Sequence, residues 1–310
     1  MPIPTDFNYT RYLGAKKPVD DRALNRQVFE ALAQALESRQ KSGRISILEV
    51  GCGIGTMLER WWDWEVLANA HYTAVDLLPE NIAAAATRLS VFARERGLRC
   101  EATGNQEWLI TSPRRSLTVS LEAADALQFT ARERGRRRWD LVLAHAFLDL
   151  LDLDTVVPLL FSLIKPEGWF SFTLNFDGAT IFLPVVDSGL DALVEKLYHG
   201  TMDSRLVDGK PSGSSLTGRR LFSVVPRFGG AIIAAGSSDW VVFPGPKGYP
   251  HDEAYFLHYL VHTVEGALRG HPLLERESLN RWASQRHQQI GRGELVYMAH
   301  QLDFFGIKKG

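Results

Sequence analysis

The chain has 310 residues, of which 45% are hydrophobic and 23% are charged, and its 35 Lys and Arg residues oppose 36 Asp and Glu residues. This is the composition of a soluble globular protein, and a net charge near zero gives no general attraction to nucleic acid or to an anionic membrane. The two cysteines, Cys52 and Cys100, form neither a disulfide framework nor a zinc-binding spacing. We therefore expect a small-molecule partner. Because we find no apolar segment of signal-peptide or membrane-spanning length, we also expect a cytoplasmic location.

The first helical pattern covers Asp20 to Arg39. Apolar residues recur there at four-residue spacing: Leu24, Val28, Leu32 and Leu36. This periodicity predicts an amphipathic helix with one buried stripe.

Strand and helix patterns alternate from Ile45 onward. The predicted strands cover 45–50, 72–76, 117–121, 139–146 and 169–176. Helical patterns separate them, and the stretch 100–116 is long enough for an extra hairpin. Five strands in this rhythm predict an α/β fold, a three-layer sandwich with a mostly parallel sheet between helices.

The regular alternation of strand and helix patterns ends after Phe176. A helix is expected around 189–200, then the Gly/Ser-rich loop KPSGSSLTG, a sixth strand region or hairpin over 230–243, and a seventh strand over 294–306. Between the last two, Pro and Gly residues bound two helical patterns. We expect three units: an N-terminal helical cap (1–40), a core (41–243 and 294–310), and a helical insertion (244–293) that forms a lid on the substrate side.

The segment LEVGCGIGTML places Gly51, Gly53 and Gly55 directly after the first strand and before a helix. In an open parallel sheet this turn is where a nucleotide-like ligand meets the backbone. A dinucleotide fingerprint needs a glycine at position 56, where Thr56 stands, and the Gly-Lys-Ser/Thr of a P-loop is absent.

The pattern from Glu49 to Gly55 resembles motif I of the class I S-adenosylmethionine-dependent methyltransferases, and the resemblance covers roughly Ile45 to Asn175. It implies a Rossmann-like, seven-stranded sheet ending in an antiparallel pair, with S-adenosyl-L-methionine as cofactor. It also implies methyl transfer by in-line displacement to an O, N or S atom of a small-molecule acceptor.

The resemblance also implies which residues bind the cofactor. Asp76, at the end of the second strand, would accept both ribose hydroxyls, although it could equally cap the helix near Pro79. Asp125 and Ala126 would bind the adenine edge, the alternative for Asp125 being an exposed loop acid. The full predicted set from these motifs is Glu49, Gly51, Cys52, Gly53, Gly55, Asp76, Leu77, Asp125 and Ala126.

Two further features lie near the expected cofactor. His145 follows the fourth strand and is either a general base for the acceptor or a packing residue beside the cofactor. Tyr9, Arg11 and Tyr12 belong to an N-terminal segment that either closes over the cofactor or packs on the surface.

His258 and His262 share one helix face at i, i+4 spacing, as metal pairs require. Tyr259 stands where a zinc-protease motif has Glu, and no third ligand is marked, so we expect no metal. With Trp240 and Tyr255 these three residues are instead predicted to line a substrate pocket.

Other functions remain open. Five arginines between Ala131 and Trp139 favour a solvated loop over a nucleic-acid surface, because the whole chain is not basic. A methyltransferase acting on protein or nucleic acid, and a non-catalytic S-adenosylmethionine-binding protein, are the alternatives.

Overall fold

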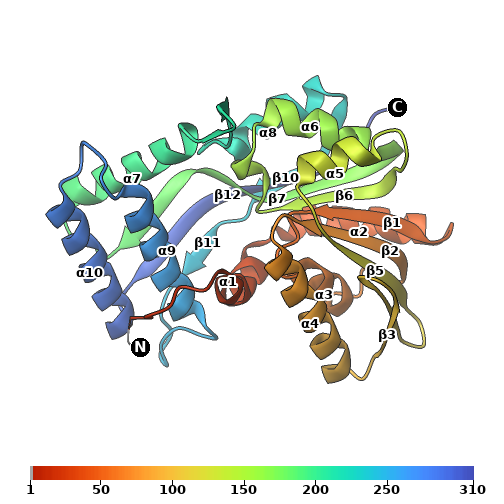
Figure 1. The fold of residues 1–310 in the computed structure, drawn as a ribbon, viewed down its shortest axis with the longest axis horizontal. Coiled ribbons are helices and arrows are strands. Elements are labelled where there is room, and N and C mark those ends of the chain that lie inside the picture. Colours follow the sequence, from red (N-terminus) through yellow and green to blue (C-terminus); the bar gives the residue numbers. More distant parts are fainter. Residues whose placement is uncertain (1–2) are drawn as a thin grey trace.

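One ten-stranded sheet carries helices on both faces (Figure 1). The structure, a computed structural model, describes residues 3–310. In sheet order the strands are β10 (Gly230–Ser237), β12 (Val296–Lys308), β7 (Ile164–Leu183), β6 (Trp139–His145), β1 (Ile45–Val50), β2 (Asn69–Asp76), β5 (Ser116–Ala123), β4 (Glu107–Thr111) and β3 (Arg99–Gly104), with β11 (Trp240–Val242) paired to β12 off this path.

The five strands from β7 to β5 are parallel to one another, whereas β12 is antiparallel to β7 and to β10. This confirms the predicted α/β class and the terminal antiparallel pair. The predicted count of seven strands is wrong for this sheet, because the hairpin β3–β4 extends it beyond β5 and β11 is a separate strand. The region 230–243 is not a hairpin, since β10 and β11 both pair with β12.

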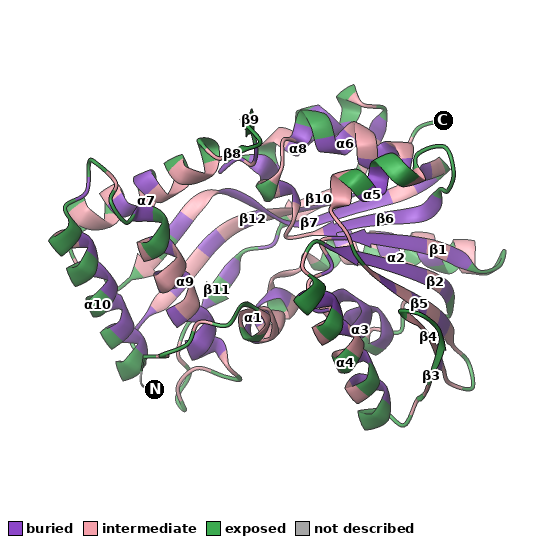
Figure 2. Ribbon diagram, in the orientation of Figure 1, coloured by how far each residue is buried: buried purple, intermediate pink, exposed green. Residues whose placement is uncertain are grey.

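Apolar helix faces cover both sides of the sheet, whose strands are mostly buried (Figure 2). One side holds α2 (Arg26–Gln40), α3 (Thr56–Asp63) and α4 (Pro79–Glu95), and the other holds α5 (Ala126–Glu133), α6 (Leu153–Ser162) and α8 (Thr217–Arg227). A buried strand surface on both sides is what continuous apolar runs such as Leu141 to Ala144 require. Across residues 3–310, no helix has the length and apolar character needed to cross a membrane.

The single helix predicted over Asp20 to Arg39 is wrong, because the chain breaks between α1 (Tyr9–Ala23) and α2. Asn25 causes the break. Its side chain accepts the Val28 N–H and caps α2, while its own N–H donates to Asp303 Oδ2 at 2.8 Å. An N-cap of this type starts a new helix rather than continuing the old one.

The ends of β7 and β12 leave the core sheet and form an outer lobe with β11, α1, α7 (Ser188–Asp203), α9 (Glu253–Leu268) and α10 (Arg276–Arg292). The lobe begins at a bulge, 177–179, between the pairs Phe176–Gln301 and Thr180–Ala299. It has its own hydrophobic core, to which α1, α9 and α10 all contribute. The predicted cap and insertion therefore pack against each other, and the division into three units stays a prediction.

Candidate functional site

A cavity of about 640 Å³ lies at the carboxyl ends of the parallel strands, between the core sheet and the outer lobe. Its size is typical of small-molecule sites. Thirteen of the predicted site residues line it: Tyr9, Tyr12, Glu49, Gly51, Cys52, Gly53, Asp76, Leu77, Asp125, Ala126, His145, Trp240 and Tyr259.

Arg11 and Gly55 were predicted to bind the cofactor, but they do not line this cavity. Arg11 projects outward and makes a two-bond ion pair with Asp252, at 2.8 and 2.9 Å. Gly55 caps α3 with φ +78°, and a Cβ there would lie 3.3 Å from the Cβ of Ala85. The ion pair explains why residue 11 is an arginine, and the positive φ and the nearby Ala85 explain why residue 55 is a glycine.

Three residues of the predicted substrate pocket lie instead inside the outer lobe. The Tyr255 hydroxyl accepts the N–H of Asn8 at 2.6 Å. His258 is buried with its Nδ1 2.8 Å from Nδ1 of His287, and the ring of His262 stacks on Phe7 with centroids 4.0 Å apart. Within the described chain, no group of three or more His, Cys, Asp and Glu side chains is placed to hold a metal.

The glycine turn adopts the left-handed backbone that favours glycine. Gly51 has φ +69°, and a Cβ on it would lie 2.3 Å from Cδ2 of Phe147. The bare backbone at this position therefore admits an aromatic ring from the turn after β6. Sequence reasoning missed Phe147, although it lies in the segment after the fourth strand.

The carboxylate of Asp76 organises the same corner of the cavity. Oδ2 accepts the Gly53 N–H at 2.8 Å, and Oδ1 accepts the Leu78 N–H at 3.0 Å and Nδ2 of Asn81 at 2.9 Å. An ionised carboxylate offers about four acceptor positions, so about one remains. The binding of both ribose hydroxyls by Asp76 stays a prediction, with about one acceptor position left for them. Oδ1 of Asn81 is buried without a partner beside it and provides a second acceptor.

Asp125 begins α5 as its N-cap. Oδ1 accepts the N–H groups of Leu127 at 3.0 Å and Gln128 at 2.9 Å, which stabilises the first turn of the helix. The neighbouring Ala126 also lines the cavity. The helix start thus holds Asp125 and Ala126 together at one end of the site.

Glu49 lies at the end of β1 and is only 1% exposed. Burial raises the pKa of this carboxyl to about 7, even though it accepts the hydroxyl of Tyr72 at 2.7 Å. A positively charged ligand in the cavity would favour its ionised form.

His145 is held by hydrogen bonds at both ring nitrogens. Arg60 Nη1 lies 3.2 Å from Nε2, and because a guanidinium can only donate, Nε2 must accept. Nδ1 then carries the proton and donates to the Thr173 hydroxyl at 2.6 Å. Burial lowers the pKa of His145 to about 4. The structure thus favours the packing interpretation of His145 over the general base.

A buried charge cluster lies beside His145. Asp20 accepts Nζ of Lys16 at 2.6 Å and Nε1 of Trp240 at 3.0 Å, and Arg60 Nη2 lies 3.4 Å away. Burial alone would raise the pKa of Asp20, but the charges of Lys16 and Arg60 hold it well below its usual range. The cluster ties α1 to β11 and α3 at the back of the cavity.

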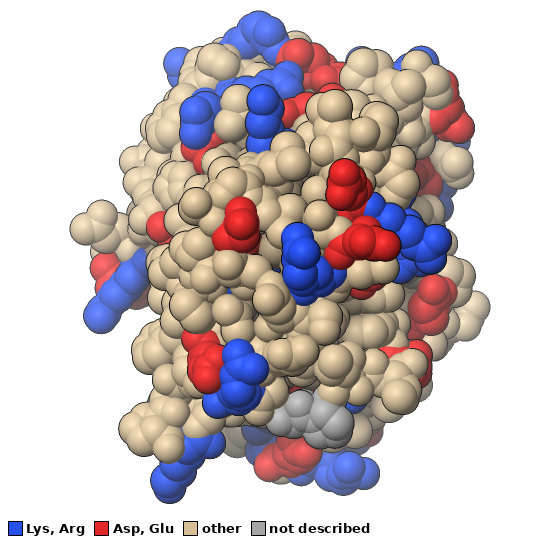
Figure 3. Space-filling view, turned by 90° about the vertical axis from the view of Figure 1, so that its left-hand side faces the viewer, with Lys and Arg blue, Asp and Glu red and all other residues tan. Residues whose placement is uncertain are grey.

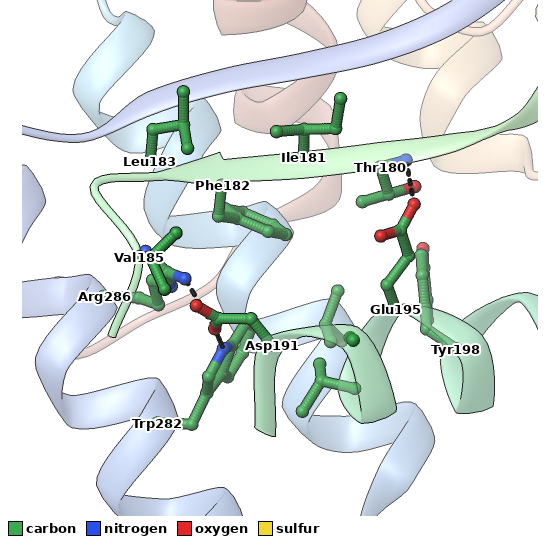
Figure 4. Close-up of a pocket in the computed structure, with 13 residues that line it drawn as sticks. Thr180, Ile181, Phe182, Leu183, Val185, Asp191, Glu195, Tyr198, Trp282 and Arg286 are labelled. Atoms are coloured by element: carbon green, nitrogen blue, oxygen red, sulfur yellow. Dashed lines mark hydrogen bonds and ion pairs between the residues drawn. The ribbon is translucent and has the colours of Figure 1, made fainter. Parts of the chain in front are cut away.

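The cavity is also lined by Asp149, Tyr198 and Arg205, none of which the sequence analysis selected. Burial raises the pKa of Asp149, and it raises that of Tyr198 to about 12. Behind Tyr198 a second cavity of about 180 Å³ lies between β7, α7, α9 and α10 (Figure 4). Tyr198 and Thr180 line both cavities.

No protein-family model matches the chain, and no curated protein is similar to it in sequence. Among solved structures, it is similar to a SAM-dependent methyltransferase from Methanosarcina mazei, with 12% identity over 86% of this chain and 93% of that one and a TM-score of 0.43. A cyclopropane synthase from Mycobacterium tuberculosis gives 10% identity over 98% and 100% of the two chains, with a TM-score of 0.43. A cyclase gives 15% over 99% and 98%, with a TM-score of 0.41. Since these scores are low, the fold assignment rests on the strand order of the chain itself.

Proposed function

We propose that the protein binds S-adenosylmethionine and transfers its methyl group to a small-molecule acceptor. One observation carries this proposal. The glycine turn, Asp76 and the Asp125–Ala126 pair, which the resemblance selects from three separate parts of the chain, all reach one cavity at the carboxyl ends of parallel strands.

The residues present fit the chemistry of this cofactor. The remaining acceptor position of Asp76 and the unpartnered Oδ1 of Asn81 suit the two ribose hydroxyls. The free oxygen of Asp125 suits the exocyclic amine of adenine, and Glu49 provides a carboxylate for the positive charges of the ligand.

The cofactor supplies an activated methyl group, so the protein must mainly align the reactants and exclude water. Aromatic rings of α1 and α9 close the cavity on the lobe side: Tyr12 stacks on Tyr259 with centroids 4.3 Å apart, and Tyr9 on Tyr12 at 6.0 Å. Because neither nitrogen of His145 is free, proton transfer from the acceptor is not assigned to it.

A small acceptor is favoured by the position of the cavity, which lies between the core sheet and the outer lobe rather than on an open surface. On the lobe face shown in Figure 3, basic and acidic side chains are interspersed, which is not the pattern of a nucleic-acid surface. Protein and nucleic-acid acceptors remain the competing possibilities.

Two measurements test the proposal. Titration calorimetry with S-adenosylhomocysteine is expected to show one saturable site, and absence of binding would contradict the proposed function. Incubation with tritiated S-adenosylmethionine and cell extract, followed by separation into small-molecule, protein and nucleic-acid fractions, is expected to label the small molecules. Label found only in the protein or nucleic-acid fraction would mean that the acceptor is a macromolecule of that kind. Binding of S-adenosylhomocysteine without labelling of any fraction would favour a non-catalytic binding protein.

A further inference from the structure

Two oppositely charged side chains on the far wall of the cavity lack partners. Oδ1 of Asp149 is buried and accepts no hydrogen bond. Over residues 3–310, the guanidinium of Arg205 makes no ion pair and donates no hydrogen bond, although it lines the same cavity. Arg205 is half-buried, so water reaches its guanidinium, and its positive charge opposes the rise that burial causes in the pKa of Asp149. Oδ1 of Asp149 has no access to water, and a buried polar atom without a partner is costly unless a ligand satisfies it.

The Gly/Ser-rich loop after α7 places Arg205 beside the turn that carries Asp149, η1 (Leu148–Leu150). The Ser212 hydroxyl donates to the Leu150 carbonyl at 2.7 Å, and the Ser214 N–H donates to the Asp149 carbonyl at 3.3 Å. Between them, a Cβ on Gly213 would lie 2.7 Å from the Asp149 carbonyl oxygen and 3.6 Å from Arg205 Nη1. Any larger residue at 213 would separate the loop from the turn.

Lys16, another cation of the cavity, pairs with Asp20 inside the protein. Asp76, Asp125 and Glu49 are assigned above to the cofactor. Asp149 and Arg205 are therefore the pair left for the acceptor, and they lie on other elements than the residues assigned to adenosine.

We propose that Asp149 and Arg205 bind the methyl acceptor, which is an amphoteric molecule of the amino-acid type carrying both a carboxylate and a basic nitrogen. Arg205 takes the carboxylate through two parallel N–H bonds, the geometry that a guanidinium favours. Asp149 accepts from the nitrogen. This inference rests on the proposed function and specifies its substrate class.

The lining next to the pair suits an apolar group on the acceptor. Tyr198 stands between the pair and the second cavity, whose walls include Phe182, Val194 and Trp282 (Figure 4). In that cavity Arg286 binds Asp191 at 2.6 Å, and Glu195 accepts the Thr180 N–H at 3.0 Å. An apolar side group of limited size suits this space, and a second charge does not.

One competing ligand has the same charges, because the cofactor itself ends in an ammonium and a carboxylate. The affinity for S-adenosylhomocysteine shows which of these two ligands the pair binds. If the pair binds the acceptor, its substitution leaves the affinity for S-adenosylhomocysteine unchanged, and if it binds the cofactor tail, that affinity falls.

The experiment compares the full-length wild type with Arg205→Gln, Arg205→Lys and Asp149→Asn. The matched control is Arg26→Gln, whose side chain is 89% exposed and paired only with Glu30. Circular dichroism and thermal unfolding establish that each variant folds. Calorimetry then measures the affinity for S-adenosylhomocysteine. It also measures, at saturating S-adenosylhomocysteine, binding of three matched probe sets: apolar amino acids and their N-methyl forms, the corresponding methyl esters, and the corresponding 2-hydroxy acids.

We expect wild type and the control to bind at least one amino-acid probe ten-fold or more tightly than its ester and its hydroxy acid. Arg205→Gln should bind acid and ester alike, Arg205→Lys should keep part of the preference, and Asp149→Asn should lose the preference for the amine. A ten-fold loss of S-adenosylhomocysteine affinity in Arg205→Gln would overturn the assignment in favour of the cofactor tail. The assignment would also be overturned if the wild type bound no amino-acid probe, or if it bound the esters and the hydroxy acids as tightly as the amino acids. Failure of the wild type to bind S-adenosylhomocysteine contradicts the proposed function instead.

Discussion

Replacing Asp76 with alanine tests the cofactor corner of the cavity. The change removes the acceptor for the Gly53 and Leu78 N–H groups and for Nδ2 of Asn81, and it removes the single remaining position for a ribose hydroxyl. A hydrogen bond to a charged group contributes about 1.5–3 kcal/mol, so the dissociation constant for S-adenosylhomocysteine should rise roughly 10- to 150-fold. Loss of the two backbone contacts, at the same magnitude for each, should lower the free energy of unfolding by about 3–6 kcal/mol.

Calorimetry at a temperature where the variant is folded measures the first effect, and urea unfolding measures the second. Asp63→Ala is the matched control, because Asp63 pairs with Arg96 outside the cavity and an exposed pair contributes about 0–1 kcal/mol. A folded Asp76→Ala protein with wild-type affinity would refute the assignment of this corner to ribose. A stability loss without an affinity loss would leave Asp76 with the role of a helix and turn residue only.

Three other substitutions have defined outcomes. Gly51→Ala should abolish measurable S-adenosylhomocysteine binding, because its Cβ would lie 2.3 Å from the Phe147 ring, whereas Gly97→Ala, with φ +64° and open space around it, controls for backbone strain alone. Burial raises the pKa of Glu49 to about 7 from 4.5, so the folded state keeps a proton that the unfolded chain loses. Urea titrations should therefore show the stability of wild type falling relative to Glu49→Gln by up to about 3 kcal/mol as the pH rises from 4.5 to 7, and a constant difference would count against this. Asp20→Asn leaves the buried ammonium of Lys16 without its carboxylate partner, whereas Arg60 keeps its ion pair with Asp21, and the change should cost about 3–5 kcal/mol in unfolding free energy. A loss below about 1 kcal/mol would be incompatible with the buried cluster.

The cofactor side of the site was accessible from the sequence because its residues follow strand ends. Gly51, Gly53, Asp76 and Asp125 each stand just after a predictable strand, and parallel strands bring their carboxyl ends to one edge of the sheet. The interpretation of Asp76 still needed coordinates, because nothing in the sequence says that Asn81 reaches back to it across one helical turn.

The part of the cavity that we propose for the acceptor was poorly predicted, because its contacts are between elements distant in sequence. Arg205 reaches the cavity only because a loop without periodicity docks on the turn after β6. The i, i+4 spacing of His258 and His262 correctly placed them on one helix but could not show which face is turned toward α10 and Phe7. Helix packing, rather than local pattern, decides such assignments.

The bulge 177–179 also determines which side chains of the strand segment beyond it lie on each face of the sheet. All four residues from Thr180 to Leu183 line the second cavity. The side chains of Ile181 and Leu183 project from the opposite side of the strand to that of Phe182 and are 39% and 37% exposed (Figure 4). Because side chains alternate along a strand, a one-residue shift of this segment against β12 would exchange the two sets and turn Ile181 toward Tyr198, and a two-residue shift would restore them. The register that the bulge establishes against β12 therefore determines which side chains this segment presents to the second cavity.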